Sequence, residues 1–330
     1  MKIINNSGSG TSPEKRRVRF AEDRVSSDSA CGRQPVELFA RSVGRLTSVG
    51  GFCKRLNIFS NLVIITALAL TRIPSANGGT DPVAGEAGKG LQALVSESLN
   101  PVSGTIKVPF QSNFDFGIGP AHVTRSTLDI GPIIPFRLNE DWNLITRTII
   151  PIVSQPSAGP HEASLDGLGD INPAIFLSPA HSHHQVFGFG PSVTLPTGTS
   201  PQLTSGKWSV GPSVVYMAMP GPWMIGAVAN HQWSVAGWGK REVSTTSIQP
   251  MVIYHLPEGW YLVSIPLITA DWKAASGNHW TVPVGGGAGK VVKLGKLPLN
   301  LQLQAFYNVE RPAAHADWQL RFQMMFLFPK

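Results

Sequence analysis

The last fifteen residues, Ala316–Lys330, read ADWQLRFQMMFLFPK. Large apolar residues occupy every second position from Trp318 to Phe328, and mostly polar residues separate them in the first half. Because successive side chains of a β-strand point to opposite faces, this segment predicts a strand with one wide apolar face. Chain ends usually fray in water, so a large apolar face at this position indicates a last strand that is paired and covered.

The same period of two runs back through the chain. It is clear in GTIKVPFQSNFDFG (Gly104–Gly117) and in KLPLNLQLQAFYNV (Lys296–Val309). The segments with this pattern lie near residues 104–117, 124–138, 142–154, 167–179, 184–196, 206–219, 222–236, 242–256, 260–271, 280–293, 297–309 and 316–328. Nothing between these twelve segments has the period of a helix, so the sequence predicts an all-β, up-and-down antiparallel meander.

The connections between the segments alternate in length. RLNEDW (137–142) and LPEGW (256–260) are turn-like, whereas SQPSAGPHEASLD (154–166) and PTGTSPQLTSG (196–206) are long and polar. Outer-membrane β-barrels have short periplasmic turns and longer outer loops. The alternation therefore predicts a transmembrane β-barrel of about 12 strands in the bacterial outer membrane, with both ends of the barrel segment on the periplasmic side.

Tryptophans mark the starts of several segments, beside a connection. They are Trp142, Trp223, Trp260, Trp280 and Trp318. An amphipathic ring at a strand end is typical of the boundary between lipid and water, which favours the membrane over a soluble β-sandwich.

Prolines within the segments oppose this interpretation, because each removes a donor from the strand ladder. They include Pro109, Pro132, Pro135, Pro151, Pro173, Pro191, Pro212, Pro250, Pro266 and Pro283. We interpret them as sites of β-bulges that tighten the curvature of the barrel.

Charge is distributed unevenly along the 330 residues. The formal net charge is +7, but residues 1–76 hold 12 basic and 5 acidic residues, and residues 77–330 hold 15 of each. The main part of the chain thus has no basic surface for nucleic acid. Only 14% of all residues are charged, and 34 are glycine and 27 are proline, a composition that suits neither a helical bundle nor an ordinary soluble enzyme.

The N-terminal part predicts export. Lys54 and Arg55 precede the apolar run LNIFSNLVIITALAL, so residues 54–76 are expected to be a signal peptide. Residues 1–53 are polar, basic and aperiodic and are expected to be a disordered extension, whose Met1 we suspect is not the true start. Residues 77–100 are expected to be a short lead-in, and residues 101–330 the barrel. Both cysteines lie in 1–53, which leaves the exported part without a thiol.

Several ordered motifs resemble those of one family of bacterial outer-membrane proteins. They are VPFQSNFDFGIGP (108–120), PIIPFRLNEDWNLITRTIIPIVSQP (132–156), GLGDINPAIFLSP (167–179), FGFGPSVTLPT (187–197) and WQLRFQMMFLFPK (318–330). The family is described as the MetA-pathway phenol-degradation protein or transporter, and is sometimes misnamed neuromedin U. The resemblance implies a transmembrane barrel connected with the uptake of aromatic compounds. The aromatic last strand also resembles the signal that the barrel-assembly machinery reads.

Charged residues in the middle of strands are the candidate functional residues. A basic side chain exposed to lipid at the bilayer centre costs about 2–4 kcal/mol, so these residues are expected to face the lumen. They are Lys107, Asp115, Asp129, Arg137, Arg147, Asp170 and Arg321. They could form a selectivity filter or a structural network of ion pairs. On the same argument Leu301 and Phe322 are expected to face lipid, and Gln302 the lumen.

Other motifs point to no chemistry. His181, His183 and His184 fall in a turn without a nearby acidic or thiol ligand, so a solvated turn is expected there instead of a metal site. The glycines of GLGD (167–170) and GGGAGK (285–290) open no helix, as a phosphate-binding loop requires. No GxSxG motif is present. We therefore predict no catalytic residue, metal or cofactor.

The functional prediction is a channel or transporter for small apolar or aromatic solutes, with outer-membrane lipid, the assembly machinery and the solute as partners. A structural or surface-interaction barrel and an outer-membrane hydrolase are the alternatives.

Overall fold

The computed structural model describes residues 82–157, 164–181, 185–295 and 297–328, with side chains from Gly90 onward. The helical elements are α3 (Pro82–Leu99) and the 3-10 turn η1 (Pro257–Gly259). The strands are β1 (Ile106–Ile118), β2 (Val123–Ile130), β3 (Ile133–Arg137), β4 (Trp142–Gln155), β5 (Leu165–Leu168), β6 (Asn172–Pro179), β7 (Gln185–Thr194), β8 (Lys207–Ala218), β9 (Trp223–Gly237), β10 (Ser244–His255), β11 (Trp260–Ser264), β12 (Ile268–Asp271), β13 (Trp280–Leu294), β14 (Leu297–Glu310) and β15 (Trp318–Phe328). The predicted N-terminal extension and signal peptide lie outside these residues.

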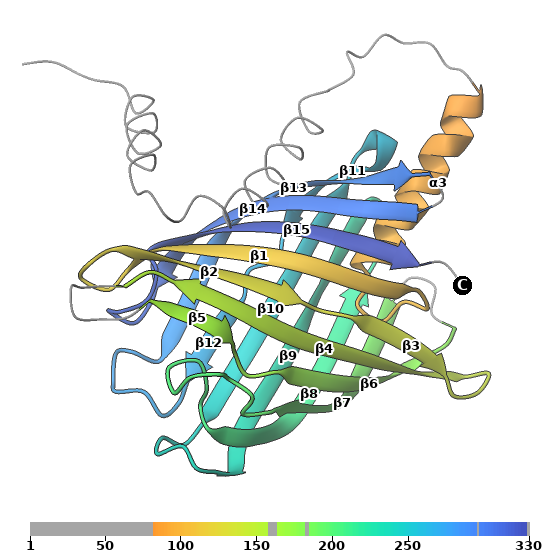
Figure 1. The fold of residues 1–330 in the computed structure, drawn as a ribbon. Helices are drawn as coiled ribbons and strands as arrows, with labels where there is room; N and C mark the ends of the chain where they lie inside the picture. Colours follow the sequence, from red (N-terminus) through yellow and green to blue (C-terminus); the bar gives the residue numbers. More distant parts are fainter. Residues whose placement is uncertain (1–81, 158–163, 182–184, 296, 329–330) are drawn as a thin grey trace, which may run out of the picture. The chain divides into compact units, whose positions relative to one another are not determined.

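The strands form a closed antiparallel barrel of twelve strands, which confirms the predicted fold class. Three of the twelve are interrupted and are divided into two labelled pieces. The pieces β2 and β3 both pair with β1 and β4, and β11 and β12 both pair with β10 and β13. The third interrupted strand consists of β5 and β6, which both pair with β4. Apart from the closing pair of β15 and β1, all other neighbours follow each other in the chain, as in an up-and-down meander (Figure 1).

The last strand closes the barrel against the first. Strand β15 pairs with β1 from Ile106 opposite Phe328 to Phe116 opposite Trp318. On the outer face the Phe116 and Trp318 rings stack with centroids 3.9 Å apart. The apolar face of the closing segment is thus the outer face of the barrel, and its polar residues point inward.

Most of the prolines do not coincide with a register shift, so the structure does not support their interpretation as sites of β-bulges for most of them. Pro283 coincides with a register shift, and Pro151 lies opposite the break between β5 and β6, across which the register against β4 changes by one residue. Pro132 and Pro266 lie in the two breaks that divide β2 from β3 and β11 from β12. Pro191 of β7 and Pro212 of β8 lie opposite each other. The ladder between β6 and β7 lacks pairs beside Pro191, and the ladder between β8 and β9 lacks pairs beside Pro212. A missing donor is therefore accommodated by a local loss of pairing, since an adjacent ladder can continue on either side.

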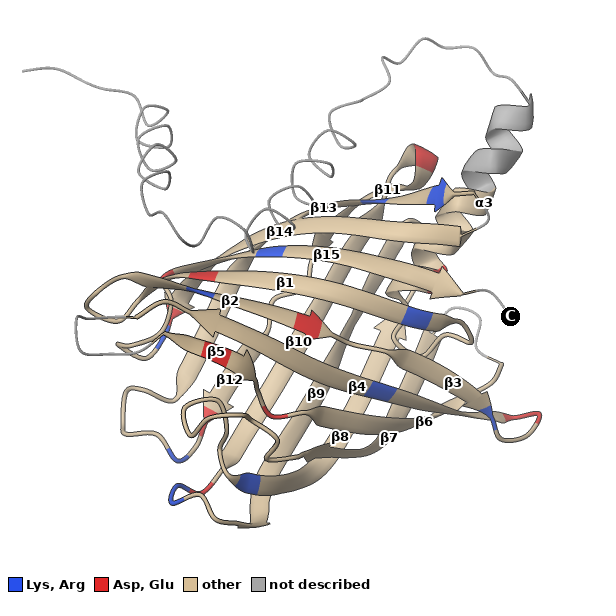
Figure 2. Ribbon diagram, in the orientation of Figure 1, with Lys and Arg blue, Asp and Glu red and all other residues tan. Residues whose placement is uncertain are grey.

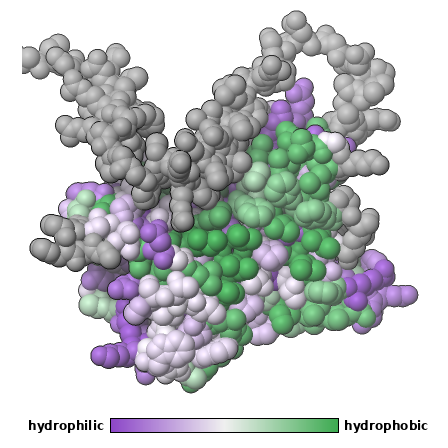
Figure 3. Space-filling model, in the orientation of Figure 1, coloured by the Kyte–Doolittle hydropathy of each residue, from purple (hydrophilic) through white to green (hydrophobic). Residues whose placement is uncertain are grey.

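The outer wall is an apolar band between two rows of aromatic side chains. Half-exposed apolar residues such as Ile175, Phe189, Val214, Val252 and Leu303 alternate with inward-facing ones. Aromatic residues at the short-turn end include Trp223 and Tyr254, whose rings are in contact. Those at the other end include Trp208, Trp233, Trp272, Trp280 and Trp318. Figure 3 shows the band on one side of the molecule, and Figure 2 shows how few charges the strands carry between their ends. A lipid bilayer is the environment that this surface suits.

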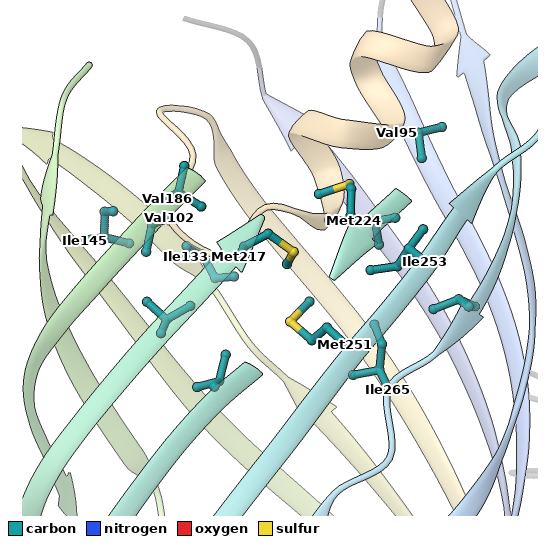
Figure 4. Packing of buried hydrophobic residues seen from close by; sticks show 14 of the residues in the cluster. Val95, Val102, Ile133, Ile145, Val186, Met217, Met224, Met251, Ile253 and Ile265 are labelled. Atoms are coloured by element: carbon teal, nitrogen blue, oxygen red, sulfur yellow. The ribbon is translucent and has the colours of Figure 1, made fainter. Parts of the chain in front are cut away.

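Helix α3 lies at the short-turn end, within the segment expected to be a lead-in. Leu91, Val95 and Leu99 recur every four residues and so fall on one face of the helix. Val95 and Leu99 are buried in one cluster with residues of the barrel wall, including Met217, Met224 and Ile253 (Figure 4). Among the described residues, no helix has both the length and the apolar character needed to span a membrane.

The end of α3 follows from local chemistry. Pro101 disfavours a helical conformation at Asn100, so the helix ends at Leu99. The Asn100 side-chain oxygen then accepts a hydrogen bond of 3.0 Å from the backbone N–H of Val102, which fixes the turn that leads into β1.

Candidate functional site

The barrel interior contains two cavities that share part of their lining. A cavity of about 140 Å³ lies towards the short-turn end, and one of about 310 Å³ lies beyond it towards the long loops. Asp129, Arg147 and Arg321 line both cavities. Side chains therefore do not fill the lumen completely, as they do in barrels of about eight strands.

The two cavities differ in character. The smaller one is lined largely by apolar side chains, including Leu99 of α3, Phe176, Val215, Met251 and Ile265. The larger one is lined mainly by polar side chains, including Asn172, Thr194, Asn230, Gln232 and Ser247. A solute that moves along the lumen would thus pass from a polar chamber into an apolar one.

Helix α3 closes the apolar chamber at the short-turn end. Its Ser98 hydroxyl accepts a hydrogen bond of 2.7 Å from the Asn300 side-chain amide of β14. Asn300 in turn accepts one from the Tyr261 hydroxyl. All three side chains are buried, so a continuous polar contact ties the helix to the wall.

A lysine completes the same attachment. Lys107 is fully buried, and its ammonium donates to the carbonyls of Glu97, at 3.2 Å, and of Asn100. The last carbonyls of a helix have no partner within the helix and lie at its negative end, so a cation is favourable there. Of the residues expected to face the lumen, Lys107 thus holds the helix in place.

Arg321 reaches along the inner wall from β15 to the break between β11 and β12. Its guanidinium donates to the Asn113 side chain at 3.0 Å, to the carbonyl of Ile265 at 2.7 Å and to the Gln319 side chain at 3.0 Å. Its charged carbon also lies 5.0 Å from the centre of the Phe306 ring. These partners are all neutral, so they fix the position of the charge without cancelling it.

Asp129 is the acidic residue beside Arg321 and Arg147. It accepts a hydrogen bond of 2.8 Å from the Asn113 side chain and a long one of 3.5 Å from Gln111. Among the described residues, no ion pair within 4.0 Å joins Asp129 to either arginine. The network of ion pairs that was one of the two alternatives for these residues is therefore not formed between Asp129 and the arginines.

The remaining charged candidates lie away from this centre. Asp170 lines the larger cavity and accepts hydrogen bonds from the backbone N–H groups of Gly198 and Ser205 and from the Ser205 hydroxyl, so it anchors the loop between β7 and β8. Asp115 accepts from Gln319 at 2.7 Å, near the long-loop end. Arg137 is exposed at the end of β3 and lines neither cavity.

Apart from Gln302, sequence reasoning missed the uncharged half of the lining. Gln249 lines both cavities, Gln302 and Gln304 line the smaller one, and Gln304 accepts a hydrogen bond of 2.9 Å from the N–H of Ile265 in the break between β11 and β12. The signal was available, because glutamine and asparagine occupy the polar positions of the alternation. Leu301 and Phe322 fall on the opposite, outer face of the same strands by that alternation.

A polar cluster lies on the outer wall near the long loops. His231 of β9 contacts two residues of β10, with Nδ1 2.7 Å from the Thr246 hydroxyl and Nε2 3.4 Å from the Ser244 hydroxyl. The Trp272 indole N–H donates to Thr246 at 2.8 Å. Neighbouring residues of both strands line the lumen, so alternation places this cluster on the membrane side.

The histidine turn lies only partly within the described residues. His181 is exposed, and His183 and His184 lie outside. In the part of the chain that the structure describes, no three histidine, cysteine or acidic side chains are grouped as metal ligands would be.

A closed strand ladder, an apolar band between aromatic rows and a partly open polar lumen define the class: an outer-membrane β-barrel. The sequence matches no protein-family model and no curated protein. Among solved structures, the COG4313 outer membrane channel from Pseudomonas putida F1 is similar over 68% of this chain and 96% of that one, with 18% identity and a TM-score of 0.55.

Two further barrels are more distant. Outer membrane phospholipase A from Escherichia coli is 13% identical over 73% of this chain and 97% of its own, with a TM-score of 0.36. The CymD monoaromatic hydrocarbon channel is 8% identical over 71% of this chain and 92% of its own, with a TM-score of 0.38. These likenesses concern the barrel architecture and carry no conclusion about the solute.

Proposed function

We propose that this barrel is a passive channel or transporter for small apolar or aromatic solutes across the bacterial outer membrane. The observation that carries the proposal is the pair of cavities in series, which together occupy the lumen from the polar long-loop side to the apolar chamber under α3. A purely structural barrel would have no need for unfilled space lined by buried charges, because such charges are costly without a function or a partner.

The solute class is supported by the chamber and by the family resemblance. The apolar chamber has a volume on the order of the ~150 Å³ cavity that accommodates benzene in another protein. Its apolar lining favours a body without hydrogen-bonding groups. The motifs that resemble the MetA-pathway phenol-degradation family agree with a solute of this kind.

Location and assembly belong to the same proposal. The aromatic rows at both ends of the apolar band fit a bilayer, and the fold is that of outer-membrane barrels. The last described strand ends at Phe328, on the outer face, in the manner of a signal for the barrel-assembly machinery. An export signal within residues 54–76 would bring the chain there.

Passage through the lumen would require α3 to move, since it closes the apolar chamber. A reversible lock tests this requirement. A Cβ atom placed on Gly259 would lie 3.3 Å from the Cβ of Leu91, slightly less than the separation of about 3.5–4.5 Å found across a disulfide. It would also lie 2.9 Å from the Val291 carbonyl oxygen at a φ of +77°, so the backbone there has to shift, and the single Gly259→Cys variant controls for that shift. The exported part of the chain contains no other cysteine, so Leu91→Cys/Gly259→Cys offers one possible pairing.

The experiment measures conductance in planar bilayers and uptake of phenol into liposomes by the full chain, in which Cys31 and Cys53 are replaced by serine so that the introduced pair is the one that can form. We expect the unmodified protein to support both. Oxidation of the double variant should reduce both, and a reductant should restore them, whereas single Gly259→Cys and single Leu91→Cys controls should not respond. A barrel silent in both assays contradicts the channel, and an oxidised lock without effect contradicts the movement of α3.

An ester hydrolase that faces the membrane is the second candidate, on the strength of the outward cluster of Ser244, His231 and Thr246. A hydroxyl, an imidazole and an orienting group in sequence are the parts of a serine hydrolase site. Ser244 is only 9% exposed, however, which leaves a lipid ester little access to its hydroxyl. Release of fatty acid from phosphatidylcholine vesicles, abolished by Ser244→Ala while conductance is unchanged, would favour this candidate.

A further inference from the structure

We infer that the lumen around Arg147 and Arg321 binds the carboxylate of a small apolar acid, whose body lies in the apolar chamber. This inference names the substrate class of the proposed channel and relies on that proposal only for access to the cavities. It rests on an arginine without a partner, a second arginine fixed by neutral groups, and an adjoining chamber of the size of a six-membered ring.

Arg147 has an unused guanidinium. It lines both cavities, and among the described residues no hydrogen bond or ion pair reaches its side chain. An arginine presents five N–H donors in a planar fork that matches a carboxylate in two parallel bonds. Because the protein supplies no acceptor for these donors, they can donate hydrogen bonds to an acceptor group of a solute inside the barrel.

Arg321 contributes a second positive charge that is held in place. It is 4% exposed, and Asn113, Ile265 and Gln319 occupy three of its N–H groups. Because none of these acceptors is an anion, the field of the guanidinium extends into both cavities that it lines. A fixed charge of this kind favours an anion without any rearrangement of the site.

The other charged residues of the lining do not cancel the excess. The Lys107 ammonium is engaged by the carbonyls at the end of α3, and the Asp170 carboxylate by Gly198 and Ser205. Asp129 is the acidic residue that lines both cavities with Arg147 and Arg321, and Asp115, which lines neither cavity, also attracts Arg321. The residues that line both cavities thus carry one positive charge more than they have negative charges, and a monoanion would balance it.

The apolar chamber selects the rest of the molecule. Phe176, Val228, Met251, Ile265 and Met325 line the same cavity as the two arginines. A volume of about 140 Å³ leaves room for one ring and no long chain. A carboxylate at the arginines with an aromatic or alicyclic ring beside it would use both parts of the cavity, whereas an inorganic anion would use only the charged part.

The test measures binding of benzoate to the purified full chain in a nonionic detergent by titration calorimetry. Benzyl alcohol is the matched probe, because it has the same ring and no charge, and sulfate is the probe for an anion without a ring. Variant Arg147→Gln removes the unpartnered charge. Variant Arg137→Gln is the control, because it removes an arginine that lines neither cavity.

We expect benzoate to bind more tightly than either matched probe. Arg147→Gln should weaken the binding of benzoate by a factor of about ten or more, because a charge-assisted pair of hydrogen bonds is lost. The same variant should leave the affinity for benzyl alcohol unchanged. Arg137→Gln should change neither. Asp129→Asn removes the opposing negative charge and should therefore strengthen benzoate binding. A gain in affinity cannot result from misfolding, so this variant tests the site even if an arginine variant fails to fold.

Three results would overturn the inference. These are equal affinity for benzoate and benzyl alcohol, an equal effect of Arg147→Gln and Arg137→Gln on benzoate, and sulfate binding as tight as benzoate. Ion conductance in planar bilayers is measured on the same preparations. A conducting barrel that does not distinguish benzoate refutes the carboxylate site and keeps the channel, whereas a silent barrel that binds benzoate refutes the channel and keeps the site.

Discussion

The Asn300 side-chain amide of β14 donates a hydrogen bond of 2.7 Å to the Ser98 hydroxyl of α3, a residue 202 positions earlier in the chain. Both groups are buried, and Asn300 also accepts the hydroxyl of Tyr261. This contact attaches the helix to the inner wall at the mouth of the apolar chamber. It makes the closure of the lumen a specific interaction and not only an apolar fit.

The variant Ser98→Ala should loosen the helix. It leaves a buried amide donor without an acceptor, which costs about 1–3 kcal/mol. We therefore expect a lower free energy of unfolding in urea and a larger single-channel conductance, because α3 is released more easily while the barrel ladder is intact. Ser96→Ala is the control, because Ser96 is only partly buried on the same helix. A Ser98→Ala barrel as stable and as closed as the unmodified one would show that the contact is incidental.

The variant Gly289→Ala should disturb the same wall. A Cβ atom at this position would lie 2.2 Å from the Tyr261 ring, so the ring would have to leave its place between β13 and Asn300. Overpacking of this kind costs about 1–3 kcal/mol. Gly104→Ala, where a Cβ atom meets nothing within 4 Å, is the control. The heat-modified mobility of the folded barrel in gels measures the difference. Equal stability of the two variants would mean that Tyr261 has another position available.

The two faces of β14 should respond differently to charge. Leu303 is 39% exposed on the outer wall, whereas Gln302 lines the apolar chamber. Leu303→Arg near the middle of the strand should cost about 2–4 kcal/mol and reduce the amount of assembled barrel. Gln302→Arg should assemble more fully, because its side chain can reach the lumen. Equal yields of the two in outer-membrane fractions would argue for a sheet with water on both sides.

Trypsin on intact cells should distinguish the two ends of the barrel. Lys240 and Arg241 are exposed in the long loop between β9 and β10, and Arg137 is exposed at the end of β3, beside the short turn before β4. If the long loops face outward, fragments should end at Lys240 or Arg241 in intact cells, and at Arg137 only after the outer membrane is opened. Cleavage at Arg137 in intact cells would reverse the topology.

The strands and their order could be predicted from the sequence, because they depend on local information. A period of two decides which face a residue occupies, and connection length decides which end of a barrel a loop joins. The interrupted strand made of β2 and β3 could be recognised as the single segment 124–138, since both pieces keep one register against β4 and the pattern resumes on the same face. The inward direction of Arg321 and Gln302 follows from the same rule.

Helix α3 could have been expected from Leu91, Val95 and Leu99, but three glycines within Pro82–Leu99 weaken the helical signal. Its stability comes from burial against Met217, Met224 and Ile253, which are more than a hundred residues away. A local pattern does not contain such contacts, because packing of this kind exists only after the barrel has closed.

The sequence by itself determined a membrane barrel of twelve strands, since the alternation of apolar and polar residues acts on neighbours within one strand. Only the tertiary structure decided that Arg147 would lack a partner, that Arg321 would be held by neutral groups, and that Arg137 would line neither cavity. All three are charged residues at alternating positions and look alike in the chain. Their roles differ because the charges around a residue depend on which strands face each other across the barrel. Electrostatic interactions depend on those distances, and the spacing of residues along the chain does not determine them.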